Sequence, residues 1–346
     1  LVYCFEQVTP GAANPSAGLN PPAPTPVFSV SSGYMESGTK VTISCPGATI
    51  RYTTDGSTPT KDSPVYTGEL TISSNITIRA RAFMDGRLPS DDSAGSYLVG
   101  RRHDMPVIFL STDPANLYDY NTGILADGPG YNKTQESPHT GANYWQDWER
   151  PIHFEYVDEN GVAQLEFNAG VKVFGQYSRD MPQKSLAINL KDKYGPAEIC
   201  YPLFGDGAAT NVFSSLVLRN SGQDGYTAHI RDAYITQVLK GQVDVDFMDY
   251  RPVVVYINGE YNGLYDLRER IDESYIANRT GADEDNVDLI KGNSIVNAGS
   301  MDAYRELLAY ANGHDLSQKE NYDHVASLVD IEELIDYWIT ISFFGN

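Results

Sequence analysis

One lysine stands where a charged side chain is costly. In residues 184–190 the two-residue period of a strand puts Lys184 on the same face as Leu186, Ile188 and Leu190. An ammonium group along an apolar face is unfavourable unless it meets an anion, so the pattern predicts a carboxylate or phosphate partner. The alternative is that Lys184 lies at the end of the strand and its amine reaches water.

Other patterns that carry chemistry are missing. The sequence has no G-x-x-x-x-G-K-[ST] phosphate loop, no G-x-S-x-G nucleophile elbow and no H-E-x-x-H zinc pair. The six histidines show no ligand spacing, so we expect surface or core histidines and no metal site. Cys4, Cys45 and Cys200 form no C-x-x-C, so the sequence predicts neither a zinc site nor a disulfide framework.

Composition limits the class of protein. A chain of 346 residues predicts two or three domains, and a formal charge of −21 disfavours nucleic acid as a partner. The sequence contains no apolar run of about 18 residues, so we expect no membrane insertion.

The elements that must position Lys184 are strands, a loop and a hairpin. Strands are expected at 105–110, 152–157, 170–175 and 184–190, with a long loop at 118–145 and a turn at 176–183. Asn258-Gly259 predicts a tight hairpin turn between strands 251–257 and 260–267.

Helices are expected after these strands. Thr227 and Gly241 are the predicted N-cap and C′ residues of a helix at 229–240. Beyond the hairpin the chain is expected to be helical, from about Asp272 onward. Capping-box spacings at Ser317 with Glu320 and at Asp330 with Glu333 open the last two helices.

The N-terminal part reads differently. Residues 14–26 are proline-rich and predict a semi-rigid linker, so residues 1–13 belong to something upstream. Residues 27–99 alternate apolar and polar side chains between Asp-Gly turns, which is typical of an immunoglobulin-like β-sandwich. The segment Ile50 to Pro59, with Ser63 to Tyr66 and Ile78 to Phe83, resembles the chitobiase/β-hexosaminidase C-terminal module. Residues 1–13 resemble the last strand of a lamin-tail-like domain.

A second resemblance covers 105–346. The residues that carry it are Gly175, Ser178, Arg179, Pro182, Lys184, Ser185, Leu218, Arg219, Asn220, Asp224, Arg231, Asp232, Asn258 to Tyr261, Gly263 to Tyr265 and Glu269. Together they resemble the spore coat protein H (CotH) kinase family. The resemblance implies an α+β, atypical protein-kinase-like domain that transfers phosphate from ATP, with Mg²⁺, to Ser/Thr hydroxyls of proteins.

The resemblance also implies roles for individual residues. Lys184 is the expected phosphate-binding lysine and Arg179 a second phosphate ligand, unless Arg179 is a structural ion-pair partner. Tyr261 or Tyr265 would stack on adenine at the hinge, unless both only pack the hairpin. Glu269 would be a hinge or lysine-pairing acid, unless it bridges Arg268 or Arg270 on the surface.

The same family pattern places the catalytic and magnesium-binding aspartates after the last helix, beyond Asn346. We therefore expect the domain to be incomplete, no catalytic or metal-binding residue in this chain, and no kinase activity from it alone. The intact protein is expected to be a bacterial exported enzyme at the cell surface or spore coat. The alternatives are a non-catalytic surface scaffold or adhesion protein that binds cell-wall or other polysaccharide, and a glycosidase, for which no acid pair stands out.

Overall fold

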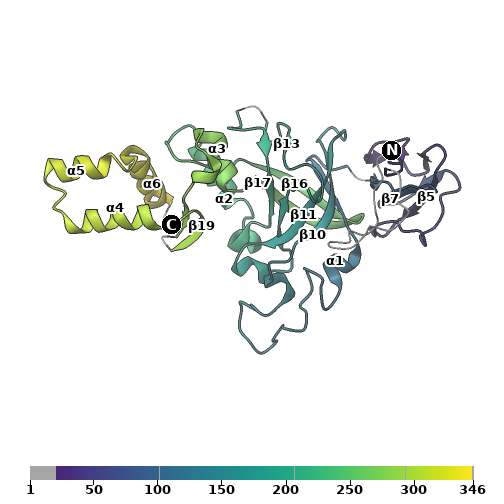
Figure 1. Ribbon diagram of the computed structural model, residues 1–346, viewed down its shortest axis with the longest axis horizontal. Helices are drawn as coiled ribbons and strands as arrows, with labels where there is room; N and C mark the ends of the chain where they lie inside the picture. The colour runs from purple at the N-terminus through teal and green to yellow at the C-terminus, as the bar shows by residue number, and fades with distance from the viewer. Residues whose placement is uncertain (1–20, 101, 206, 293, 345–346) are drawn as a thin grey trace, which may run out of the picture. The chain divides into compact units, whose positions relative to one another are not determined.

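A computed structural model describes residues 21–100, 102–205, 207–292 and 294–344 (Figure 1). The predicted lamin-tail-like remnant at 1–13 and most of the linker lie outside this part. The chain forms two compact units. One comprises the residues up to Ala197 with Leu218–Gly222 and Pro252–Leu267, and the other comprises Glu198–Val217, Gln223–Arg251 and Arg268–Asn346.

The N-terminal module is built from short strands, as predicted. They are β1 (Val27–Phe28), β2 (Gly33–Met35), β3 (Thr39–Val41), β4 (Ile43–Ser44), β5 (Thr49–Thr53), β6 (Leu70–Ile72), β7 (Ile76–Phe83) and β8 (Ser93–Val99). A four-stranded sheet runs β2-β8-β7-β5, and β1-β4 and β3-β6 form two-stranded ribbons. Their inward side chains make one core that includes Val41, Ile72, Ile78 and Tyr97, all nearly fully buried.

A closed seven-stranded barrel follows, in the order β10-β11-β12-β15-β17-β16-β9. Its strands are β9 (Val107–Ser111), β10 (Arg150–Val157), β11 (Ala163–Phe174), β12 (Ser185–Asn189), β15 (Ser215–Arg219), β16 (Tyr250–Ile257) and β17 (Glu260–Glu269). Between β9 and β10 lie α1 (Pro114–Tyr118) and η1 (Asn143–Trp145), and between β11 and β12 lies η2 (Tyr177–Asp180). Every residue of β12 is buried, so both faces of the strand that follows Lys184 are covered.

The second unit contains most of the helices. They are η3 (Gly222–Tyr226), α2 (Arg231–Leu239), α3 (Glu273–Thr280), η4 (Glu284–Asn286), α4 (Asp302–Gly313), α5 (Lys319–Ala326) and α6 (Ile331–Phe344), with η3 beginning at the boundary. Two short ribbons accompany them, formed by β13 (Ile199–Cys200) with β14 (Val212–Phe213) and by β18 (Leu289–Lys291) with β19 (Ile295–Ala298). Figure 1 shows α4, α5 and α6 grouped at the yellow end of the colour scale.

Most predicted elements around the barrel are confirmed. The hairpin turns at Asn258 and Gly259, with φ of 51° and 85°, which the short amide side chain and glycine tolerate. The strands at 105–110, 152–157, 170–175 and 184–190 and the loop at 118–145 are present with shifted ends. Asp272 caps α3 by accepting from the Tyr275 amide, and Gly241 follows α2 with a positive φ.

Some local predictions are wrong. Thr227 does not cap a helix, because α2 begins at Arg231 and the Thr227 hydroxyl is bonded to Asp224. Ser317 does not cap α5, which begins at Lys319 without a side-chain cap, whereas Asp330 does accept from the Glu333 amide. The stretch after the hairpin is not all helical, since β18 and β19 interrupt it.

Candidate functional site

A cavity of about 330 Å³ opens beside Lys184. Its walls combine apolar, amide and phenol groups from Tyr118, Leu125, Pro182, Gln183, Lys184, Leu186, Asn262 and Tyr265. Lys184 lies one residue before β12, and Asn262 and Tyr265 come from β17, the second strand of the Asn-Gly hairpin. The predicted lysine and the predicted hairpin therefore share one cavity.

The Lys184 amine is bound by backbone carbonyls and an aromatic ring. Its Nζ donates to the carbonyl oxygens of Arg179 at 2.8 Å and Met181 at 3.0 Å. It also lies 3.8 Å from the centroid of the Tyr144 ring. Burial lowers the pKa of Lys184 to about 8, against the opposing effect of Asp180 and Asp127. The sequence predicted an anionic partner, but backbone carbonyls and a ring face take that place.

Asn220 fixes the segment that carries Lys184. Its backbone N–H donates to Ser185 Oγ at 2.9 Å, and Ser185 Oγ donates to Asn220 Oδ1 at 2.7 Å. The side-chain Nδ2 of Asn220 donates to the Gln183 carbonyl at 2.6 Å. Asn220 and Ser185 are both nearly fully buried. Three bonds around a buried amide leave residues 183–185 little freedom, so the site lysine is set in a rigid frame.

Arg179 belongs to the same frame. Its guanidinium donates to the carbonyls of Gly175, Tyr144 and Trp145, and it lies 5.5 Å from the Trp145 ring centroid. Burial lowers the pKa of Arg179. Both alternatives for this residue proposed ionic partners, whereas the structure gives it carbonyl oxygens, and the phosphate role remains a prediction.

The loop at 118–145 is hydrogen-bonded to Asp180 of η2, which lies next to the Lys184 segment. The carboxylate accepts from the Ser137 hydroxyl, the His139 amide and ring, and Trp145 Nε1, at 2.6 to 2.9 Å. Asp180, Tyr144 and Trp145 were not among the predicted site residues. The aromatic pair at the end of a long Gly/Asn-rich loop was the available signal.

The two tyrosines of the hairpin have different environments. Tyr265 is 1% exposed, donates from its hydroxyl to the Lys184 carbonyl at 3.1 Å and accepts from Asn262 Nδ2 at 2.8 Å. Burial raises its pKa. Tyr261 is 60% exposed and stacks on His103 at 6.4 Å between ring centroids. Only Tyr265 lines the cavity of Lys184, and adenine stacking by either ring remains a prediction.

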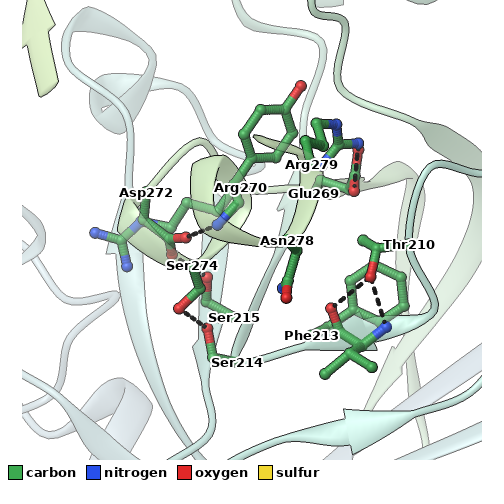
Figure 2. A pocket seen from close by; sticks show the side chains of 12 residues that line it. Thr210, Phe213, Ser214, Ser215, Glu269, Arg270, Asp272, Ser274, Asn278 and Arg279 are labelled. Atoms are coloured by element: carbon green, nitrogen blue, oxygen red, sulfur yellow. Dashed lines mark hydrogen bonds and ion pairs between the residues drawn. The ribbon is translucent and has the colours of Figure 1, made fainter. Parts of the chain in front are cut away.

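Glu269 lies in the other compact unit, beside a small second cavity (Figure 2). Its two carboxylate oxygens accept from Arg279 Nη2 at 2.8 and 2.6 Å, and its side chain is 3% exposed. Bridging of Arg268 or Arg270 on the surface is therefore wrong. The cavity, about 20 Å³, is sized for a water molecule and not for a nucleotide.

The other predicted family residues have structural partners. An added Cβ on Gly175, which has a φ of +107°, would collide with Ser178 Oγ, so this turn requires glycine. Asp224 accepts from the Arg231 amide at 2.9 Å and from Thr227, and it thereby caps α2 in place of Thr227. Asp232 pairs with the buried Arg268, and Arg219 ends β15.

Comparison with known protein families assigns four strands of the barrel, β12, β15, β16 and β17, and the helices that accompany them. The model of the CotH kinase protein family matches residues 171–346, more than half of the 346-residue chain. The chain belongs to the CotH kinase protein family. The match includes Lys184, Asn220 and the hairpin, and it begins later than the boundary predicted at 105.

The N-terminal module is also matched. The chitobiase/beta-hexosaminidase C-terminal domain model covers residues 30–94, inside the 27–99 predicted from sequence. No curated protein matches the chain. Among the described residues, none of the helices has the length and apolar character needed to cross a membrane.

A CotH kinase implies ATP and Mg²⁺, and the cavity fits them unequally. Lys184 offers an ammonium and Asn262 and Gln183 offer amides to phosphate oxygens. The eight residues that line the cavity include no carboxylate, so they do not supply the oxygen ligands that Mg²⁺ prefers. The donors of the cavity suit the phosphate oxygens of ATP. The cavity lacks the carboxylates that a magnesium site would need.

Proposed function

We propose that this chain is part of an exported atypical protein kinase that transfers phosphate from ATP to Ser/Thr hydroxyls of surface or spore-coat proteins. The observation that carries the proposal is Lys184, a residue of the family-matched region that lines a cavity and whose amine is held by backbone carbonyls. Bound in this cavity, ATP would supply the phosphoryl group that is transferred.

Lys184 would act by holding negative charge in place. Phosphoryl transfer depends on positioned cations more than on covalent chemistry by the protein. The Lys184 ammonium has three N–H donors, and it bonds to the Arg179 and Met181 carbonyls. A triphosphate oxygen would accept from one of the three donors. Tyr265 and Asn220 would keep the lysine aligned, because both bond to the 183–185 segment.

Other parts of the proposal remain predictions. They are the binding roles of Arg179, Tyr261, Tyr265 and Glu269, and a surface or spore-coat location. The domain boundaries at 27–99 and 105–346 are also predictions.

Titration of a fluorescent ATP analogue tests the proposal. Lys184→Ala should weaken binding about tenfold or more, since a hydrogen bond to a charged group contributes about 1.5–3 kcal/mol. Lys61→Ala is the matched control, because Lys61 is an exposed lysine of the N-terminal module. Equal affinities for wild type and Lys184→Ala would remove the lysine from nucleotide binding.

A second candidate function is a carbohydrate-associated scaffold, which the match of residues 30–94 favours. The module has an open hollow of about 470 Å³ whose lining includes Ser44, Thr49 and Tyr66. Glycan-array binding by the full chain, lost in Tyr66→Ala while ATP binding persists, would support this function.

A further inference from the structure

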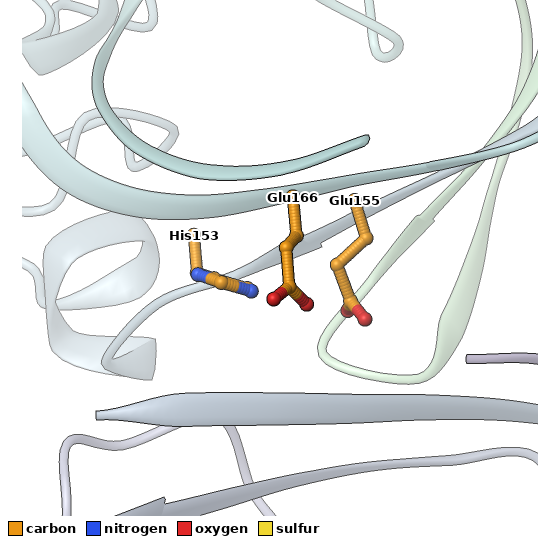
Figure 3. Close-up of side chains that lie close together, drawn as sticks. All are labelled: His153, Glu155 and Glu166. Atoms are coloured by element: carbon orange, nitrogen blue, oxygen red, sulfur yellow. The ribbon is translucent and has the colours of Figure 1, made fainter. Parts of the chain in front are cut away.

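Three side chains that can ligate a metal gather on one face of two barrel strands. One ligand atom each from His153, Glu155 and Glu166 lies within 4.8 Å of the others (Figure 3). Glu155 on β10 stands directly opposite Glu166 on β11, and His153 is two residues along β10 on the same face. The cluster is separate from the Lys184 cavity, since the two share no residue.

The two carboxylates create an uncompensated negative charge. Like charges directly opposite each other across a strand pair are destabilising. Glu155 is 2% exposed and accepts from the hydroxyls of Ser32 and Ser96. Within the described residues, no lysine or arginine pairs with either carboxylate. Glu155 is buried whereas Glu166 is exposed, so the charge of Glu155 is the costly one, and a cation between the two carboxylates would offset it.

His153 points its lone pair at this pair of carboxylates. The ring is 6% exposed, and Nδ1 lies 2.9 Å from Asn168 Oδ1. An amide oxygen accepts, so Nδ1 is the donor of this bond, and in the neutral ring with the proton on Nδ1 the other nitrogen, Nε2, keeps its lone pair. Nε2 is buried and has no hydrogen-bond partner in the described part of the chain. Figure 3 shows the ring directed toward Glu166.

We propose that His153 Nε2 and carboxylate oxygens of Glu155 and Glu166 bind a divalent transition-metal ion, Zn²⁺ or Mn²⁺. Three protein ligands of mixed imidazole and carboxylate type, with further positions open, suit these ions. An imidazole ligand disfavours Mg²⁺ and Ca²⁺, which prefer sites made only of oxygen. Asn168 then has the role of the outer partner that fixes the ring tautomer of a ligating histidine.

The ion also stabilises the fold around it. Glu155 links β10 to Ser32 and Ser96 of the N-terminal module through its hydrogen bonds. A cation on the carboxylate removes the repulsion with Glu166 and leaves both hydroxyl bonds in place. The ion therefore raises the melting temperature, by an amount that depends on metal concentration.

Calorimetric titration of the chelator-treated chain with ZnCl₂ or MnCl₂ in excess Mg²⁺ tests the site. Wild type should bind one ion, and Glu166→Gln should weaken binding tenfold or more. Glu136→Gln, a change at an exposed loop glutamate, should bind as wild type does. The proposal is wrong if wild type binds neither ion, or if Glu166→Gln binds as tightly as wild type.

Thermal melting gives a second test, because the difference in melting temperature between Glu166→Gln and wild type should change sign when Zn²⁺ is added. Without metal, Glu166→Gln should melt at or above the melting temperature of wild type, because the substitution removes the repulsion between the carboxylates of residues 155 and 166. With Zn²⁺, wild type should gain several degrees and Glu166→Gln should gain little. A lower melting temperature for Glu166→Gln under both conditions would assign Glu166 a purely structural role and overturn the proposal.

Cobalt spectroscopy checks the histidine. Co²⁺ added to the chelator-treated chain should give visible absorption stronger than that of aqueous Co²⁺, and His153→Gln should remove it. A spectrum identical to that of aqueous Co²⁺ with folded wild type would contradict ligation by His153.

Discussion

The ammonium nitrogen of Lys184 lies over the ring of Tyr144, 3.8 Å from its centroid. The ring face favours the charged form, whereas burial lowers the pKa of Lys184 to about 8. Tyr144→Leu should lower this pKa further by about 0.4–1.5 units, since a cation–π contact contributes about 0.5–2 kcal/mol. Tyr144→Phe keeps the ring and should leave the pKa unchanged. NMR titration of methyl-labelled lysine measures both.

The same pKa sets the pH dependence of nucleotide binding under the proposed function. Below about pH 8 the Lys184 amine is charged, and above it the neutral form prevails. ATP affinity should therefore fall as the pH rises through about 8 or somewhat higher, since a bound phosphate itself favours the ammonium. Lys184→Ala should show weak binding without this fall. A wild-type affinity that is flat from pH 7 to 10 would contradict the prediction.

Asp180 should contribute to stability against acid. Burial opposes the charged form, but the bonds from Ser137, Trp145 and His139 lower the pKa of Asp180 to about 2. A carboxylate with a depressed pKa stabilises the fold above its unfolded pKa, and this stabilisation is lost as the pH falls from about 4 toward 2. Asp180→Asn should therefore lose about 2 kcal/mol of unfolding free energy at pH 7.

Urea unfolding at several pH values measures this loss. Asp180→Asn should show a weaker dependence on pH between 5 and 2 than wild type. Asp62→Asn, at an exposed position of the module, should match wild type throughout. Identical acid dependence for all three proteins would show that Asp180 contributes nothing in this range.

The frame around Lys184 should behave as one unit. Asn220→Ala removes the acceptor of the Ser185 hydroxyl proton and the side-chain donor to the Gln183 carbonyl, while the backbone N–H of residue 220 still donates to Ser185 Oγ, and we expect a loss of about 2–3 kcal/mol. Ser185→Ala should cost less when Asn220 is already alanine. A double-mutant cycle of unfolding free energies measures the coupling, and strictly additive losses would show that the two side chains act independently.

The buried Glu269–Arg279 pair predicts asymmetric mutational effects. Glu269→Ala strands a guanidinium that is 8% exposed, and it should destabilise the chain by about 3–5 kcal/mol. The double variant Glu269→Leu with Arg279→Met removes both charges and should recover much of this loss. Chemical denaturation compares the variants. A double variant less stable than Glu269→Ala would show that the pair itself is strongly stabilising.

Local patterns determined much of this protein. Alternation of apolar residues, Asp-Gly and Asn-Gly turns and the Asp272 cap depend on neighbours in the chain, so the β-rich module, the hairpin and α3 could be predicted. The residues around Lys184 and Asn220 that carry the family resemblance could likewise be recognised from the sequence. The predicted caps at Thr227 and Ser317 were wrong for different reasons. The Asp224 carboxylate accepts at the start of α2, and α5 begins without a side-chain cap.

Only the tertiary structure decided the partners of the charged groups. The pattern of residues 184–190 predicted an anionic partner for Lys184, whereas folding brings the carbonyls of 179 and 181 and the ring of Tyr144 to its amine. Glu166 faces His153 and Glu155 only through the β10–β11 register. Contacts between distant residues depend on register and chain reversal, which no local spacing encodes.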